Sequence, residues 1–157
     1  CVQPIKTIKL SSMQQSINVN FLSFALIVRV LLHRSMKSSL KNIIIISSNV
    51  SNRGAKAFSI YAATKGALDA MMRCLAVELA PQVRVNSILP GAIMSSMTDD
   101  LLSDKDVAER MQREYPLGFG SPENIADMVD FLLSEKAQWI TGQQITIDGG
   151  RSINISG

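Results

Sequence analysis

The chain has 157 residues, of which 46% are hydrophobic and 18% are charged, and its formal net charge is +3. This balance is typical of one globular domain that buries its own core without disulfides or metals. So small a positive charge does not indicate nucleic-acid binding. The nearest approach to a basic cluster is typical of a solvated surface and consists of Lys37, Lys41, Arg53 and Lys56.

The first predicted element is a long helix over residues 12–36, N-capped by Ser11 or Ser12. Its most apolar stretch, residues 17–32, is too short for a membrane span and is interrupted by polar residues. A signal peptide would begin with basic residues and end at a small-residue cleavage site, and the sequence shows neither feature. We therefore expect a largely buried helix, in a protein without a membrane segment.

Two strands and a second long helix follow. Residues 42–48 form a continuous β-branched run, which is typical of a strand buried on both faces of a parallel sheet. A helix is predicted over residues 59–79, where Pro81 ends it. Residues 83–89 form the next strand, which a Pro-Gly pair stops.

The last third begins with a long irregular connection, residues 92–121, with a short helix predicted at 104–114. Long loops of this kind tend to be functional. A helix then opens with Ser121 as N-cap and Pro122 at its first position, and a short strand ends before the final glycines. Strands separated by helices predict the α/β class, a Rossmann-like parallel sheet with flanking helices, as a single domain over residues 1–157.

The cysteines and the single histidine do not form a metal-binding pattern. Cys1, Cys74 and His33 lie far apart, so the sequence predicts no metal site. Cys74 falls in an apolar helical run, where we expect it to fill the core. Unpaired cysteines favour a reducing, cytoplasmic compartment.

A doubly wound sheet that binds a dinucleotide carries a glycine-rich turn after its first strand. The sequence contains no such turn, because the pair Gly118 and Gly120 follows no predicted strand. Two explanations stay open. Either the protein does not bind a dinucleotide, or the part that binds it lies outside this sequence, which begins with Cys1 rather than Met.

Tyr61 and Lys65 stand four residues apart in FSIYAATK, so they share one face of the predicted helix. A lysine ammonium beside a phenol favours the tyrosinate and lowers the phenol pKa from its usual value near 10. Such a phenol can give a proton to a carbonyl oxygen or take one from an alcohol. Chance produces this spacing often, so an exposed Tyr and Lys remain the alternative.

The ends of the predicted strands add to this pair. Ser48 lies at the carboxyl end of a buried strand, where open α/β sheets bind their ligands, and its hydroxyl could hydrogen-bond a substrate oxygen. A turn residue that satisfies local backbone is the alternative for Ser48. The segment 89–95 ends the next strand on the same edge, so we expect two strand ends and one helix start to converge on one crevice.

The segments NIIIISSNVSNRGAKAFSIYAATKGALDAMMRCLAVELAP, VRVNSILPGAIMS and WITGQQITIDGG stand in the order and at the spacing of a known family. In them the chain resembles the short-chain dehydrogenase/reductase family of the classical type, over about residues 12–150. The resemblance implies that Tyr61 is the catalytic acid/base and that Ser48 orients the substrate oxygen. It implies that Lys65 lowers the Tyr61 pKa and holds the nicotinamide ribose.

The resemblance also implies a fourth catalytic residue and a cofactor segment. Asn20, in INVNF, corresponds to the residue that holds a water in the proton relay; without the family pattern, a polar helix residue with a local bond is the simpler interpretation. Pro90, Gly91 and Ile93 correspond to the segment beside the nicotinamide of NAD or NADP. Ser95 replaces the usual threonine and could bond the cofactor's amide or phosphate. The DGG signature at residues 148–150 is expected to be structural.

By resemblance, the activity is NAD(P)-dependent interconversion of an alcohol and a carbonyl, as in 3-oxoacyl carrier-protein reductases or sugar and polyol dehydrogenases. The family's glycine-rich turn belongs before residue 1, so the chain is expected to be the C-terminal part of a doubly wound fold. The alternative is a catalytically incompetent fragment that acts only as an association module. The expected partners are a small-molecule substrate and further copies of the chain, in a homodimer or homotetramer formed through helices 12–36 and 59–80.

Overall fold

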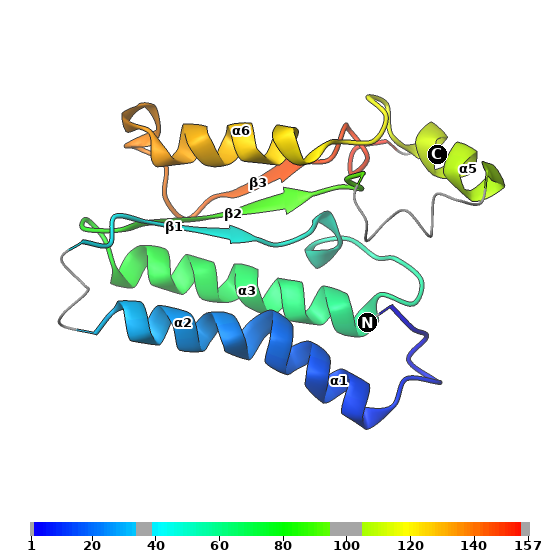
Figure 1. Ribbon diagram of the computed structural model, residues 1–157, viewed down its shortest axis with the longest axis horizontal. Helices are drawn as coiled ribbons and strands as arrows, with labels where there is room; N and C mark the ends of the chain where they lie inside the picture. The colour runs from blue at the N-terminus through cyan, green and yellow to red at the C-terminus, as the bar shows by residue number, and fades with distance from the viewer. Residues whose placement is uncertain (1, 34–38, 95–104, 155–157) are drawn as a thin grey trace.

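The computed structural model describes residues 2–33, 39–94 and 105–154. A three-stranded parallel sheet in the order β1-β2-β3 runs through it (Figure 1). The strands are β1 (Asn42–Ile46), β2 (Arg84–Pro90) and β3 (Gln144–Ile147). β1 and β2 lie within two residues of the predicted strands 42–48 and 83–89, β3 is the short strand predicted before the final glycines, and the predicted α/β class is confirmed.

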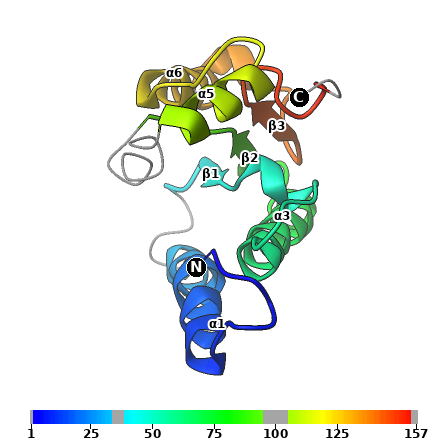
Figure 2. The same cartoon turned by 90° about the vertical axis from the view of Figure 1, so that its right-hand side faces the viewer.

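Helices cover both faces of this sheet. On one side lie α3 (Ser59–Glu78) and, next to it, α1 (Leu10–Ile17) and α2 (Ser23–Leu31) (Figures 1 and 2). On the other side lie α6 (Pro122–Leu133) and α5 (Lys105–Glu114). The short helices η2 (Asn49–Ser51) and η3 (Glu135–Ala137) follow β1 and α6.

The continuous isoleucine run of β1 is explained by helices on both sides. Ile43 and Ile45 belong to the core between the sheet and α3, whereas Ile44 packs into the core beneath α6. Successive side chains of a strand point to opposite faces, so a strand covered on both faces needs apolar residues throughout. β2 is also buried over its five middle residues, although two of these, Asn86 and Ser87, are polar.

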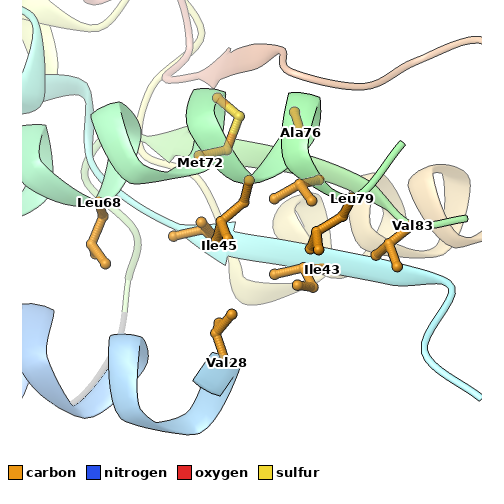
Figure 3. Close-up of a cluster of buried hydrophobic side chains, with 10 residues drawn as sticks. Val28, Ile43, Ile45, Leu68, Met72, Ala76, Leu79 and Val83 are labelled. Atoms are coloured by element: carbon orange, nitrogen blue, oxygen red, sulfur yellow. The ribbon is translucent and has the colours of Figure 1, made fainter. Parts of the chain in front are cut away.

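The core on the α3 side anchors the helix that carries the predicted catalytic pair (Figure 3). Met72 of α3 is fully buried beside the strand residues Ile43 and Ile45. Val28 of α2 joins the same cluster from the neighbouring helix. Burial of these side chains fixes α3 along the sheet, and its first turn lies near the carboxyl end of β1.

The first predicted helix differs from expectation in its start and its regularity. It begins at Leu10, and the N-cap is Lys9 without a side-chain cap bond, so the predicted caps Ser11 and Ser12 are wrong. A π-helical turn, η1 (Asn18–Leu22), separates α1 from α2. Such turns are rare and are frequently found at functional sites, and this one contains Asn20. α2 ends at Leu31, and residues 34–36 of the predicted helix lie outside the described residues.

The prediction that residues 17–32 form a largely buried helix is wrong. Val28 is buried, but Val19 and Val30 are each 62% exposed. The reason is that the helix pair packs against α3 and β1 along one side only, a contact that hydropathy alone does not reveal (Figure 2). In the part of the chain that the structure describes, no helix is both long and apolar enough to cross a membrane.

Cys74 is exposed, so its predicted place in the core is wrong. The buried face of α3 passes through Met72, Leu75 and Ala76. With 3.6 residues per turn, position 74 falls on the opposite side, which faces away from the sheet. Because alanine and methionine occur on every side of α3, the sequence alone does not show which side of the helix is buried.

The C-terminal elements agree with the predictions. Ser121 is the N-cap of α6 and Pro122 its first residue. The side-chain oxygen of Asn124 accepts a hydrogen bond from the Ser121 amide at 2.8 Å, which satisfies a free donor at the helix start. α6 therefore begins where its sequence signals predict.

Candidate active site

The predicted catalytic residues Ser48 and Tyr61 meet at the carboxyl end of β1. Ser48 is the extended residue before η2, and its oxygen accepts a hydrogen bond from the Val50 amide at 3.4 Å. Tyr61 lies in the first turn of α3, and a side-chain hydrogen bond joins its phenol to Ser48. Ser48 is thus both a turn residue and a partner of the phenol, so its two interpretations are compatible.

Lys65 lies one helical turn after Tyr61 and turns toward β1. Its Nζ donates a hydrogen bond to the carbonyl oxygen of Ile46 at 2.9 Å, and it lies 5.7 Å from the centre of the Tyr61 ring. Burial lowers the pKa of Lys65, while the carboxylate of Asp69, one turn further along α3, acts to raise that pKa. The ammonium is therefore held between the end of β1 and the phenol ring.

The expected lowering of the Tyr61 pKa does not occur in this arrangement. Burial raises the pKa of Tyr61 above its ordinary value of 10.0, and the hydrogen bond with Ser48 acts in the opposite direction without reversing it. The Lys65 ammonium takes the Ile46 carbonyl as its acceptor, and burial is the dominant influence on the phenol. The expectation drawn from spacing alone is wrong because spacing does not report burial.

Asn20 joins this group from the π-helical turn. Its Nδ2 donates a hydrogen bond to Thr64 Oγ1 at 3.1 Å, and the Thr64 hydroxyl donates to the carbonyl oxygen of Tyr61 at 2.7 Å. The alternative interpretation of Asn20, a polar residue with a local bond, is wrong because its partner lies 44 residues away. The structure thus brings Ser48, Tyr61 and Lys65 together, and it links Asn20 to the same helix through Thr64, a residue that the sequence did not indicate.

The segment after β2 lies on the same edge of the sheet. Gly91 donates its amide hydrogen to the carbonyl oxygen of Ile147 at 2.9 Å, which continues the pairing of Pro90 with β3. Ile93 forms a bridge with Gly120 and lines a cavity of about 510 Å³. That cavity lies beside α6 and is lined by none of the four predicted catalytic residues. The fourth predicted cofactor residue, Ser95, lies outside the described residues.

Asp148 connects the strand ends. Its carboxylate accepts hydrogen bonds from Asn49 Nδ2 at 3.2 Å, from the Gly150 amide at 3.2 Å and from the Ser152 amide at 2.8 Å. Burial acts to raise the pKa of Asp148, but these hydrogen bonds prevail and lower it below its ordinary value of 3.8. Asn49 is buried and was not singled out from the sequence, where it is one more polar residue in a loop.

Replacing Asp148 by Asn is expected to flatten the acid dependence of stability. Because the folded-state pKa is lowered, ionised Asp148 stabilises the fold above pH 3.8, and this contribution is lost as the pH falls through the lowered value. The wild-type free energy of unfolding should therefore drop more steeply in acid than that of Asp148→Asn. Urea unfolding between about pH 2 and pH 6 measures both slopes. Asp130→Asn, at an exposed carboxylate of α6, is the control and should keep the wild-type slope.

The assembled side chains can support proton transfer at a small polar group. Two hydroxyls, of Ser48 and Tyr61, are joined by a hydrogen bond, and the Lys65 ammonium lies beside the phenol ring. These groups can bind a carbonyl or alcohol oxygen and exchange a proton with it. Within residues 2–33, 39–94 and 105–154, no group of three or more His, Cys, Asp or Glu side chains could hold a metal ion.

Comparisons with known proteins identify similar sequences over nearly the whole chain. A family model described as enoyl-(acyl carrier protein) reductase matches residues 2–152. L-xylulose reductase from Bos taurus is 33% identical over 152 residues, which cover 95% of this chain and 62% of that protein. D-erythrulose reductase from Gallus gallus is 30% identical over 152 residues, with the same coverage. The chain therefore spans about three fifths of the length of these relatives.

Solved structures with the same fold include dehydrogenases. A structure described as 4-hydroxyisoleucine dehydrogenase complexed with NADH superposes with a TM-score of 0.91 at 28% identity, over 98% of this chain and 64% of that one. A glucose/ribitol dehydrogenase from Brucella melitensis superposes with a TM-score of 0.85 at 32% identity, over 96% of this chain and 60% of that one. With the family model matching nearly its whole length, the chain belongs to the short-chain dehydrogenase/reductase family.

Proposed function

We propose that the protein is an NAD(P)-dependent oxidoreductase that interconverts an alcohol and a carbonyl. The observation that carries this proposal is the Tyr61 phenol, hydrogen-bonded to Ser48 and flanked by Lys65, at the carboxyl edge of a parallel sheet. Open α/β sheets bind ligands at this edge. The relatives named as reductases and the neighbour complexed with NADH support the same chemistry.

Each catalytic side chain has a role that its contacts permit. Tyr61 gives a proton to the carbonyl oxygen during reduction and takes one from the alcohol during oxidation. Ser48, already bonded to the phenol, shares the same substrate oxygen and orients it. Asn20 holds a water through which the proton reaches solvent.

The donor set at this edge fits a nicotinamide cofactor. Lys65 Nζ is a partly buried cation suited to ribose hydroxyls, and Tyr61 lies beside it. The backbone of the segment that contains Pro90, Gly91 and Ile93 lies at the same edge and can bind the amide group of the cofactor. We assign Ser95 to the same segment. When bound, the cofactor supplies or accepts the hydride.

A polyhydroxy ketone or the corresponding polyol is the substrate class that we propose. The names L-xylulose reductase, D-erythrulose reductase and glucose/ribitol dehydrogenase, carried by three similar proteins, support it over a 3-oxoacyl thioester. The test follows NAD(P)H oxidation by the full-length gene product with ketoses such as xylulose and erythrulose, and with an acetoacetyl thioester. Faster turnover of the ketoses is expected, whereas turnover of the thioester alone would reject this substrate class.

Cofactor affinity separates the enzyme from its alternative, an association module. The 157 residues contain no glycine-rich turn after a strand, so we propose that this chain by itself binds NAD(H) or NADP(H) weakly. Calorimetric titration of the purified chain measures this, and micromolar affinity would contradict the proposal. A full-length gene product that binds no cofactor would instead favour the association module.

Association through the outer helices is the second part of the proposal. Exposed apolar side chains gather on η1 and α2, among them Val19, Leu26 and Val30. A continuous apolar patch on a helix pair is typical of a protein–protein interface. We therefore propose a homodimer or homotetramer formed through α1, α2 and α3, to be tested by analytical ultracentrifugation of wild type and Leu26→Glu.

A further inference from the structure

We propose that Asp69 is a positioning residue whose buried carboxylate keeps the Lys65 side chain in its ammonium form, ready for proton transfer. Asp69 lies on α3 and is not one of the four residues to which the catalytic roles are given. The inference rests on the proposed function for its effect on the reaction. The interaction between the two side chains can be measured without any activity.

Asp69 is a carboxylate in an unfavourable environment. The residue is only 2% exposed, and neither of its carboxylate oxygens has a hydrogen-bond partner among the described residues. A buried carboxylate without a partner destabilises a fold unless a nearby positive charge compensates for it. The position of Asp69 therefore directs attention to the nearest cation on the same side of α3.

Lys65 supplies that positive charge. It precedes Asp69 by four residues, so the two side chains share one face of α3. The Lys65 Nζ is held by the carbonyl oxygen of Ile46, at 2.9 Å, at the carboxyl end of β1. The attraction to Asp69 therefore acts without a hydrogen bond, through a partly buried region where water screens charges weakly. It opposes the burial that lowers the pKa of Lys65.

The elements that pack against α3 bring no competing charge to this place. α1, η1, β1 and η2 contain no charged residue. Arg84 of β2 points to the opposite face of the sheet, where its guanidinium donates a hydrogen bond to a carbonyl oxygen of α6 at 2.7 Å. Arg29 of α2 is exposed to solvent.

The remaining ionisable groups near Lys65 also leave Asp69 as the partner of its charge. The Tyr61 phenol is neutral near pH 7, because burial raises its pKa. Arg73, one turn beyond Asp69 on α3, is exposed. The Asp148 carboxylate is bonded to amide groups at the end of the sheet. Among the described residues, Asp69 is thus the carboxylate placed to stabilise the Lys65 ammonium.

Asp69→Asn tests the inference because it removes the charge and nearly keeps the shape of the side chain. In the full-length gene product labelled with 13C-lysine and free of cofactor, NMR follows the titration of Lys65, whose signal is assigned by its loss in Lys65→Met. The pKa of Lys65 should be lower in Asp69→Asn than in wild type. Glu78→Gln neutralises an exposed carboxylate of the same helix and should leave it unchanged. An unchanged Lys65 titration in Asp69→Asn would overturn the inference.

The pH profile of ketose reduction gives the second readout. The ammonium form is lost as the pH rises through the pKa of Lys65, so Asp69→Asn should lose activity at a lower pH than wild type on the alkaline side. We expect kcat to be about 10-fold below wild type near pH 9 and within roughly twofold of it at pH 6. An equal loss at every pH would assign Asp69 a packing role and overturn the inference.

A variant of different shape and a stability measurement complete the test. Asp69→Ser is also neutral and should shift the Lys65 titration in the same direction, so it replaces Asp69→Asn if that variant does not fold. Because the carboxylate has no hydrogen bond to lose, neither variant should lower the midpoint of thermal unfolding, and a large fall would overturn the inference. A shifted Lys65 titration in a protein without dehydrogenase activity would retain the interaction and reject the proposed function.

Discussion

Tyr61→Phe is expected to lower kcat of the full-length gene product by about 10³-fold, because the phenol is the group that exchanges the proton with substrate. The affinity for NAD(P)H should change little, since the ring and its contact with Lys65 remain. Steady-state kinetics and cofactor titration measure the two quantities separately. Turnover within a few fold of wild type would remove Tyr61 from the proton-transfer step.

Tyr115→Phe is the control for that experiment, because Tyr115 is the chain's other tyrosine. Its hydroxyl accepts a hydrogen bond from the Ala92 amide at 3.0 Å. Removing it should lower the free energy of unfolding by about 1 kcal/mol, the value of one such hydrogen bond. If Tyr115→Phe lost as much turnover as Tyr61→Phe, the effect of removing a tyrosine hydroxyl would come from lower stability and not from a missing proton donor.

Gly91→Ala is expected to have the largest effect on stability, about 3 kcal/mol of destabilisation. A Cβ at this position would lie 2.7 Å from the Cβ and 2.8 Å from the Cα of Asp148, and 2.9 Å from Cε1 of Tyr115. Two of these atoms belong to Asp148, the residue directly after β3, and cannot move without shifting the end of the strand. Urea unfolding of the two proteins measures the difference.

Gly54→Ala is the matched control for Gly91→Ala. A Cβ at Gly54 would meet no atom within 4 Å, so the same substitution should change the free energy of unfolding by less than about 0.5 kcal/mol. Equal destabilisation at both positions would show that the cost does not come from the contact with Asp148. A cost confined to Gly91 supports close packing between the ends of β2 and β3.

The sequence predicted the strands and the C-terminal helix well because their signals are local. The four consecutive isoleucines of β1 are bounded by polar residues, and Ser121-Pro122 marks a helix start. The N-terminal helix was predicted less well. Its apolar stretch suggested burial, but burial depends on which neighbours are present, and α3 and β1 cover one side only.

The candidate site was also predicted well in its local features and less well in those that depend on packing. The spacing of Tyr61 and Lys65 placed them on one helical face, and the structure brings both to the end of β1, near Ser48. Spacing did not reveal that burial raises the pKa of Tyr61 or that Lys65 bonds the Ile46 carbonyl. Thr64 was missed because a threonine within a helix ordinarily bonds its own backbone, and here it also accepts from Asn20.

Transfer of deuterium from the cofactor tests the central claim most directly. The full-length gene product is incubated with NADH and NADPH deuterated at C4 of the nicotinamide and with a ketose, and the polyol is examined by mass spectrometry. We predict that wild type places one deuterium on the new carbinol carbon and that Tyr61→Phe does so at a rate about 10³-fold lower. A polyol without deuterium, or equal rates for both proteins, would contradict the assignment of Tyr61 as the acid of a hydride-transfer enzyme.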